Sequence, residues 1–339
     1  MTETGEKKKG FLRRRWKTLL GIFLLLLLIL YIVFVNLLVS AALVPSFMKK
    51  LDAFQEVTEQ SVAKQVHTTA LQENHKAAMA ETRQWLEETE LIKKTMTSRD
   101  GYRLVAAEFL SEDPDAPWVV LLHGYTGWKE EMYPFACRYH RQGFNVLVPD
   151  LRCQGESDGD FIGMGWTDRV DVRDWMEQEI LSRHPDAEIV LHGQSMGGAC
   201  ALMLSGMEDL PENVRCIVSD CGYTDAYSMF RQDIRDWFGL PAFPLVDSAN
   251  LMLQIRGGYD LKKASAVEAV KKSHVPTLII HGDKDAMVPV EMAYEIYDAA
   301  QAEKELLIVE GAGHAQAQDQ DPETYYSTLQ AFLDRYLAA

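Results

Sequence analysis

The pattern of apolar and polar residues divides the chain into three parts. Nearly every residue from 19 to 43 is apolar, including an unbroken leucine run at 24–28. Residues 51–93 are polar, lack Gly and Pro, and place their apolar side chains at loose helical spacing. From residue 91 onward, short apolar runs alternate with longer amphipathic stretches. That alternation is typical of a sheet with helices on both faces.

Eight short apolar runs in the third part predict strands, at 91–96, 102–109, 118–122, 145–149, 188–192, 214–219, 277–281 and 305–309. The stretches between them predict helices at 130–142, 165–183, 196–205, 290–302 and 322–338. Asp100-Gly101 favours a tight hairpin between the first two strands, so the sheet should begin antiparallel. The later strands are separated by helices, as parallel strands require. We therefore expect an α/β fold over 91–339, with a mostly parallel eight-stranded sheet.

The alternation of strands and helices breaks down between residues 222 and 265. This stretch is rich in aromatic, aliphatic and Pro residues, including Phe230, Trp237, Phe238 and Phe243. It predicts an insertion in the α/β domain, a short cap at about 223–265. The polar middle part of the chain predicts a helical stalk over 45–90, and a helix packed against the α/β domain is the alternative.

The first apolar segment is long enough to cross a membrane, since about 20 residues suffice. A buried core helix and a cleaved signal peptide are the alternatives, and small residues at 39–42 offer a cleavage site. The apolar region of a signal peptide usually spans only about 7–15 residues. That comparison favours an uncleaved signal anchor at 18–44. The tail at 1–17 holds seven Lys and Arg, which predicts a cytoplasmic N-terminus and a body on the outer side of the cell membrane.

Charge and cysteine content narrow the range of partners. The net charge is −16, but residues 1–50 carry nine Lys and Arg against two Glu, so the rest of the chain is at −23. A body this acidic repels phosphate backbones, and we expect no nucleic-acid partner. The five cysteines form no Cys-x-x-Cys pair and have no zinc-like spacing. Cys153 and Cys221 fall in turns, and the sequence leaves their pairing open.

The most informative motif lies at 189–198, where an apolar strand runs into Gly-Gln-Ser-Met-Gly and then a helix of small residues. A Gly-x-Ser-x-Gly motif between a strand and a helix is typical of a nucleophile elbow, which holds its serine in a strained turn and exposes the hydroxyl. Ser195 is the predicted nucleophile. A passive serine in a Gly-rich turn is the alternative.

An unactivated serine is a poor nucleophile, so a base and an orienting acid should follow it in the chain. His314 lies in the Gly-containing loop 310–314 after the last strand, where an imidazole reaches back to serve as general base. Asp285 follows the strand at 277–281 and is the favoured acid from its position. Asp283, two residues away, and Asp220, at the end of an earlier strand, are the competing acids.

An oxyanion forms when a serine attacks a carbonyl, and it needs two fixed N–H donors. The backbone N–H of Met196, at the start of the helix after Ser195, is the first candidate. The second should come from the loop 123–127 after the strand 118–122, and we assign it to the backbone of Tyr125.

Together these residues resemble the α/β-hydrolase superfamily, especially bacterial membrane-anchored serine hydrolases related to monoacylglycerol lipases and serine aminopeptidase-like hydrolases. The similarity spans about 91–338. It includes 149–157, Pro-Asp-Leu-Arg-Cys-Gln-Gly-Glu-Ser, which is similar to the family's Asp-x-Arg-Gly-x-Gly-x-Ser turn, with Cys153 in place of a glycine. The resemblance implies the α/β-hydrolase fold, hydrolysis through an acyl-enzyme by Ser195, His314 and Asp285, and no metal or organic cofactor.

The resemblance and the apolar cap favour a carboxylic ester hydrolase of the esterase or lipase type, with a small-molecule ester or acyl substrate. A peptidase or an acyltransferase would use the same triad. An anchored binding protein with a decayed site is the alternative from another class.

Overall fold

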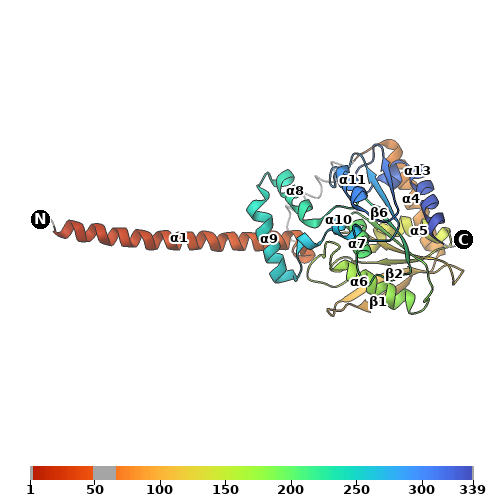
Figure 1. Cartoon of the computed structure of the whole chain (residues 1–339), viewed down its shortest axis with the longest axis horizontal. Coiled ribbons are helices and arrows are strands. Elements are labelled where there is room, and N and C mark those ends of the chain that lie inside the picture. The colour runs from red at the N-terminus through yellow and green to blue at the C-terminus, as the bar shows by residue number, and fades with distance from the viewer. Residues whose placement is uncertain (1–2, 49–65, 338–339) are drawn as a thin grey trace.

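The computed structural model describes residues 3–48 and 66–337, and its centre is a twisted eight-stranded sheet (Figure 1). The strand order is β1-β2-β4-β3-β5-β6-β7-β8. β1 pairs antiparallel with β2, β2 pairs antiparallel with β4, and every later pairing is parallel. The predicted fold class is therefore confirmed. The strands are β1 Ile92–Thr97, β2 Arg103–Phe109, β3 Trp118–Leu122, β4 Asn145–Pro149, β5 Ile189–Gln194, β6 Val214–Asp220, β7 Thr277–Gly282 and β8 Lys304–Val309.

Helices cover both faces of the sheet because successive residues of a strand point to opposite sides. In β3, Trp118, Val120 and Leu122 pack into one core, while Val119 and Leu121 pack into the other. The first core is covered by α6 Asp168–Trp175, α7 Met196–Ser205, α10 Ala266–Val270 and α11 Val290–Ala299. The second is covered by α4 Thr69–Glu88, α5 Tyr133–Arg141 and α13 Pro322–Tyr336.

Two of the predicted helices differ from the helices observed. The helix expected at 130–142 is split into a 3₁₀ turn, η1 Lys129–Met132, and α5, with Pro134 in the first turn of α5. The helix expected from residue 165 begins at Asp168, because Gly165 has a left-handed φ of +73°. It continues as a wider π-helical turn, η2 Met176–Leu181. Short helices α10 and α12 Ala317–Gln320 have too few residues to show a helical period in the sequence.

The segment predicted as a cap contains two helices, α8 Ala226–Phe238 and α9 Ala242–Gly257, and the 3₁₀ turn η3 Leu261–Lys263. An isolated antiparallel bridge joins Asp225 to Ser265, so the two ends of the segment leave the domain side by side. The Asp225 carboxylate accepts the Ser228 N–H at 2.7 Å and caps the start of α8. The two helices lie on the side of the domain from which α1 projects (Figure 1).

The middle part of the chain is described from residue 66, and 49–65 of the predicted stalk lie outside the described residues. α4 begins at the cap residue Thr68, whose hydroxyl accepts the Leu71 N–H at 3.1 Å. Trp85 is only 2% exposed, and its ring lies 4.6 Å from that of Phe109 in β2. Between the two arrangements left open for this part, α4 adopts the packed one.

α1 Glu3–Leu43 is a long helix that extends from the domain as a rod (Figure 1). Its portion Arg15–Leu43 has a mean hydropathy of 3.2 over its most apolar window and is long and apolar enough to cross a membrane. Its C-terminal end lies against α9 and is followed by the short helix α2 Pro45–Met48. The helix satisfies the requirements of a membrane anchor and also those of a signal sequence.

Candidate active site

Ser195 lies in the turn between β5 and α7, in the backbone conformation φ 55°, ψ −117°. A non-glycine residue with this φ is strained, and the strain points the hydroxyl away from the sheet. The two glycines of the motif are required by close packing. A Cβ on Gly193 would lie 2.1 Å from the Gly197 carbonyl oxygen, and a Cβ on Gly197 would lie 2.0 Å from that of Leu122. Substitution at either glycine would push the turn off the sheet.

The structure brings the predicted base and acid together with Ser195. The Ser195 hydroxyl lies 2.8 Å from His314 Nε2, and His314 Nδ1 lies 2.7 Å from Asp285 Oδ2. The three side chains come from the C-terminal ends of β5, β7 and β8, where a parallel sheet gathers its functional loops. With Nδ1–H donating to the carboxylate, Nε2 is free to accept the serine proton. The arrangement fits the predicted roles of a nucleophile, a base and an orienting acid.

Four groups surround the Asp285 carboxylate. Oδ1 accepts the backbone N–H groups of Met287 and Val288 at 2.9 and 2.8 Å, and Oδ2 faces His314 and His281 at 2.7 and 3.3 Å. Burial by itself raises the pKa of Asp285, but the hydrogen bonds from the two histidines outweigh it and hold the pKa well below its usual range. Asp285 is therefore ionised whenever His314 acts as a base.

His281 is a further contact of the site that was not among the residues predicted for it. Its Nε2 lies 2.8 Å from the Val288 carbonyl oxygen as well as 3.3 Å from Asp285 Oδ2. Its position four residues before the acid, at the end of the same strand, was the available signal.

The two competing acids lie elsewhere. Asp283 Oδ1 accepts the Gly311 N–H at 2.6 Å and so holds the loop that carries His314. Asp220 is buried beneath the elbow, where its carboxylate accepts hydrogen bonds from the Gln194 side-chain amide and the Tyr325 hydroxyl, each at 3.2 Å. Burial raises the pKa of Asp220 to about 6. Neither carboxylate is hydrogen-bonded to the imidazole of His314.

The loop predicted to complete the oxyanion site lies beside the nucleophile. A Cβ on Gly124 would lie 3.5 Å from Ser195 Cβ, so the backbone of this loop is in contact range of the serine. Within the described residues, neither the Tyr125 N–H nor the Met196 N–H donates a hydrogen bond to the protein. Unpaired backbone N–H groups on these two segments are what a developing oxyanion at Ser195 requires.

His123 connects this loop to the turn after β4. Its Nδ1–H donates to the Gly124 carbonyl at 2.8 Å, and its Nε2 accepts the Leu151 N–H at 2.9 Å. Burial lowers the pKa of His123 to about 4, so the ring is neutral near pH 7. The residue is a structural link and not a second base.

The turn after β4 also contains a buried ion pair that the sequence did not reveal. The Asp150 carboxylate accepts the Lys129 N–H and lies 2.9 Å from Lys129 Nζ, with the lysine side chain 6% exposed. Cys153, which replaces the usual glycine, has φ 65°. This left-handed φ explains why glycine suits the position. Cys153 and the other four cysteines are free thiols.

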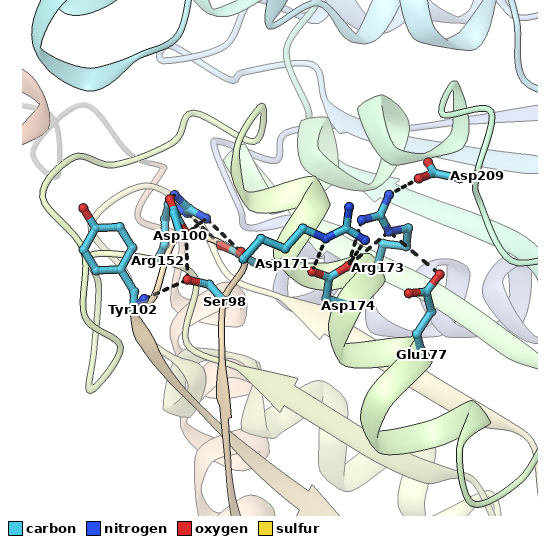
Figure 2. Close-up of polar contacts among 10 residues, drawn as sticks. Ser98, Asp100, Tyr102, Arg152, Asp171, Arg173, Asp174, Glu177 and Asp209 are labelled. Carbon is cyan, nitrogen blue, oxygen red and sulfur yellow. Dashed lines mark hydrogen bonds and ion pairs between the residues drawn. The ribbon is translucent and has the colours of Figure 1, made fainter.

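Ion pairs on the outside of this turn fix it to the domain (Figure 2). Arg152 lies between two carboxylates, 2.7 Å from Asp171 in α6 and 2.7 Å from Asp100 in the first hairpin. Further along α6, Arg173 pairs with Asp174 at 2.8 Å. The turn therefore cannot move without breaking contacts to both α6 and the hairpin.

The described part of the chain has one cluster with metal-ligand character. The ligand atoms of Cys221, Asp285 and His314 lie within 4.8 Å of one another. Two of these residues, the predicted base and acid, are hydrogen-bonded to each other, and burial raises the pKa of the Cys221 thiol. A neutral thiol is a poor metal ligand, so the residues fit a triad better than a metal centre.

The fold and the grouping of these side chains define a hydrolase of the α/β type. Family models agree: residues 117–245 match the model described as "alpha/beta hydrolase fold", and 258–337 match "TAP-like protein". The chain belongs to the α/β-hydrolase superfamily.

The relatives and solved structures that are similar to this chain have low sequence identity to it. The uncharacterized protein YqkD of Bacillus subtilis is 27% identical over 216 residues, which is 64% of this chain and 70% of the relative. The esterase Pf2001 of Pyrococcus furiosus superposes with a TM-score of 0.59 at 22% identity, over 74% of this chain and 93% of its own. The acylaminoacyl peptidase of Pyrococcus horikoshii gives a TM-score of 0.58 at 19% identity, over 76% and 44%.

Proposed function

We propose that this protein is a serine hydrolase that cleaves carboxylic esters through an acyl-enzyme. The observation that carries the proposal is the continuous hydrogen-bonded series from Ser195 through His314 to Asp285, at 2.8 and 2.7 Å. In the first half-reaction the Ser195 Oγ bonds to the ester carbonyl carbon while His314 Nε2 takes the hydroxyl proton. The carbonyl oxygen becomes negatively charged and accepts hydrogen bonds from the backbone N–H groups of Tyr125 and Met196.

The ester bond then breaks as His314 gives its proton to the departing alcohol, which leaves the acyl group on Ser195. A water molecule enters, His314 takes one of its protons, and the hydroxide attacks the acyl carbon. Collapse of this second intermediate releases the acid and returns the proton to Ser195. Asp285 stays ionised throughout and stabilises the imidazolium that forms twice per turnover.

We favour an ester over an amide because the segment 223–265 is rich in exposed apolar side chains, which suit an apolar acyl group. Turnover of a p-nitrophenyl ester should exceed that of the corresponding aminoacyl p-nitroanilide by at least about a hundredfold in kcat/KM. Equal turnover of the two substrates would favour the peptidase alternative, and transfer of the acyl group to an added alcohol in preference to water would favour an acyltransferase.

We also propose that α1 is a retained membrane anchor with the catalytic domain on the outer side. The region with a possible cleavage site is packed in the fold, where Val39 is 3% and Ser40 is 6% exposed, so cleavage there would remove part of the core. The basic tail favours a cytoplasmic N-terminus. Protease treatment of intact cells should digest the domain and spare a tag on the tail; a protected domain would refute this orientation.

A further inference from the structure

The last turns of α1 are built into the cap and do not merely lead up to it. Val35, Val39 and Leu43 recur every four residues, are each at most 3% exposed, and so form one buried stripe along the helix. Val35, at the N-terminal end of this stripe, packs with Ala242, Leu245 and Val246 of α9. A polar contact lies beside it, with the Tyr31 hydroxyl 2.9 Å from Ser248 Oγ.

The same end of α1 touches the loop next to the nucleophile. The Tyr125 hydroxyl donates a hydrogen bond to the Ala42 carbonyl, and the adjacent Gly124 is in contact range of Ser195. The Leu43 carbonyl accepts the Ile162 N–H at 2.9 Å. The end of the apolar helix is therefore part of the wall above the active site.

The length of α1 sets how deep the cap lies if α1 spans a bilayer. Lys17 is the last charged residue before the apolar run, and about 20 residues from Thr18 would end the span near Leu37. Packing against the cap already begins at Tyr31. From Tyr31 to Leu37 the helix rises about 9 Å, so the cap occupies about that depth of the outer boundary of the bilayer. Helices that lie in a membrane interface bury a similar depth, about 5–10 Å.

The cap presents an apolar surface suited to that position. Outside α1, ten large apolar side chains are exposed in the described residues. Five of them are scattered over the domain, and the other five lie within 18 residues of the cap: Phe238, Leu240, Phe243, Leu251 and Ile255. Phe243 and Ile255 are each 73% exposed. Leu251 and Ile255 are four residues apart and so lie on one face of α9. We call these five residues the cap surface.

We propose that the cap surface is seated in the lipid interface beside α1, and that the active site takes its acyl substrate directly from that leaflet. The partner is the bilayer itself, because the helix that carries most of the cap surface packs against α1, which would already be in lipid. The substrate class is a membrane-resident ester with a long acyl chain. The seating rests on the proposed anchor, and the substrate class rests on the proposed ester hydrolysis.

Seating is tested without catalysis, on the full chain in lipid nanodiscs. The partly exposed Cys153 is first replaced by Ser, since the other four cysteines are buried. In this background a cysteine at Phe243→Cys or Ile255→Cys carries an NBD fluorophore. Leu110→Cys is the control, since Leu110 is an exposed apolar residue between β2 and β3, at the opposite end of β3 from the active site. The labels at 243 and 255 should emit at shorter wavelength and be quenched by spin-labelled lipid but not by aqueous iodide. Iodide quenching at 243 and 255 equal to that at 110 would overturn the seating.

The substrate route is tested with the double variant Phe243→Asp/Ile255→Asp, against Leu110→Asp as control. We expect kcat/KM for a long-chain ester embedded in nanodiscs to fall at least tenfold in the double variant, with a soluble short-chain ester unaffected. Equal losses on both substrates, or no loss on the embedded ester, would overturn the route. If the wild-type protein hydrolyses neither ester, the proposed function fails, while the fluorescence result still decides the seating.

Discussion

Replacement of Asp285 by asparagine tests the assignment of the acid, because the structure dictates how the amide must lie. Oδ1 of Asp285 accepts two backbone N–H groups, from Met287 and Val288. The asparagine oxygen will keep that position, since the amide nitrogen has no lone pair to offer those donors. The NH₂ group is then left at the position of Oδ2, facing His314 Nδ1.

An NH₂ group in that position donates to Nδ1 and so forces the proton of the neutral imidazole onto Nε2. His314 then presents an N–H to Ser195 instead of a lone pair and cannot accept the serine proton. Holding the wrong tautomer in such a triad lowers kcat by about 10⁴-fold, which corresponds to about 5 kcal/mol in the activation free energy. We expect a loss of this size for Asp285→Asn.

The measurement is kcat on a soluble p-nitrophenyl ester, with Asp283→Asn as the matched control. Among the backbone groups that the structure describes, Asp283 accepts a hydrogen bond only from the Gly311 N–H, so its asparagine variant should retain activity within about tenfold. A thermal midpoint close to that of the wild type establishes that Asp285→Asn is folded. A loss below tenfold in folded Asp285→Asn, or a larger loss in Asp283→Asn, would refute the assignment of the acid.

Three further predictions concern the fold around the site, each measured as thermal or denaturant unfolding of the detergent-solubilised protein. Gly197→Ala should lower the unfolding free energy by about 3 kcal/mol, because its Cβ would lie 2.0 Å from the Leu122 carbonyl oxygen, which is fixed in β3; an unchanged midpoint would contradict this packing. Burial raises the pKa of Asp168 to about 7, so the folded protein keeps a proton that the unfolded chain releases near pH 4, and its stability falls as the pH rises between these values. The stability of Asp168→Asn relative to the wild type should therefore increase by up to about 1.4 kcal/mol per pH unit from pH 5 to 7, and a pH-independent difference would count against the shift. Trp85→Ala should destabilise the protein by about 3–5 kcal/mol if α4 belongs to the domain, since Trp85 packs against Phe109; an effect below 1 kcal/mol would indicate a separate stalk.

Local patterns were sufficient to predict the sheet. Each strand is a short apolar run bounded by turn residues, so the eight predicted strands overlap the observed ones with ends that differ by two residues at most. The elbow was predictable for a related reason, since a strand, a Gly-x-Ser-x-Gly turn and a helix are contiguous in sequence. The positions of Asp285 and His314 relative to Ser195 depend on contacts between strands that are distant in sequence. Their order along the chain and their places just after predicted strands were the sequence signals.

Contacts between elements that are distant in sequence were harder to predict. α4 is amphipathic, and such a pattern shows which face is buried but not against what; hence its packing on β2 and α5 was left open. The packed stripe of α1 could not be seen at all, because an α-helix that is apolar on every side has no periodic signal to mark Val35 and Val39. The pair between Lys129 and Asp150 joins residues 21 positions apart, and nothing in the sequence distinguishes these two charged residues from ones exposed to solvent.

The assignment of Ser195 as the nucleophile is tested most directly by the intact and peptide mass of the full-length protein after reaction with a fluorophosphonate. We expect one covalent phosphonate per chain, located on the peptide that contains Ser195, and no adduct in Ser195→Ala. We also expect that His314→Ala, with a thermal midpoint near that of the wild type, reacts at least a thousandfold more slowly, because the serine loses its base. An adduct at any other serine, or labelling that persists in Ser195→Ala, would contradict the claim that Ser195 is the nucleophile.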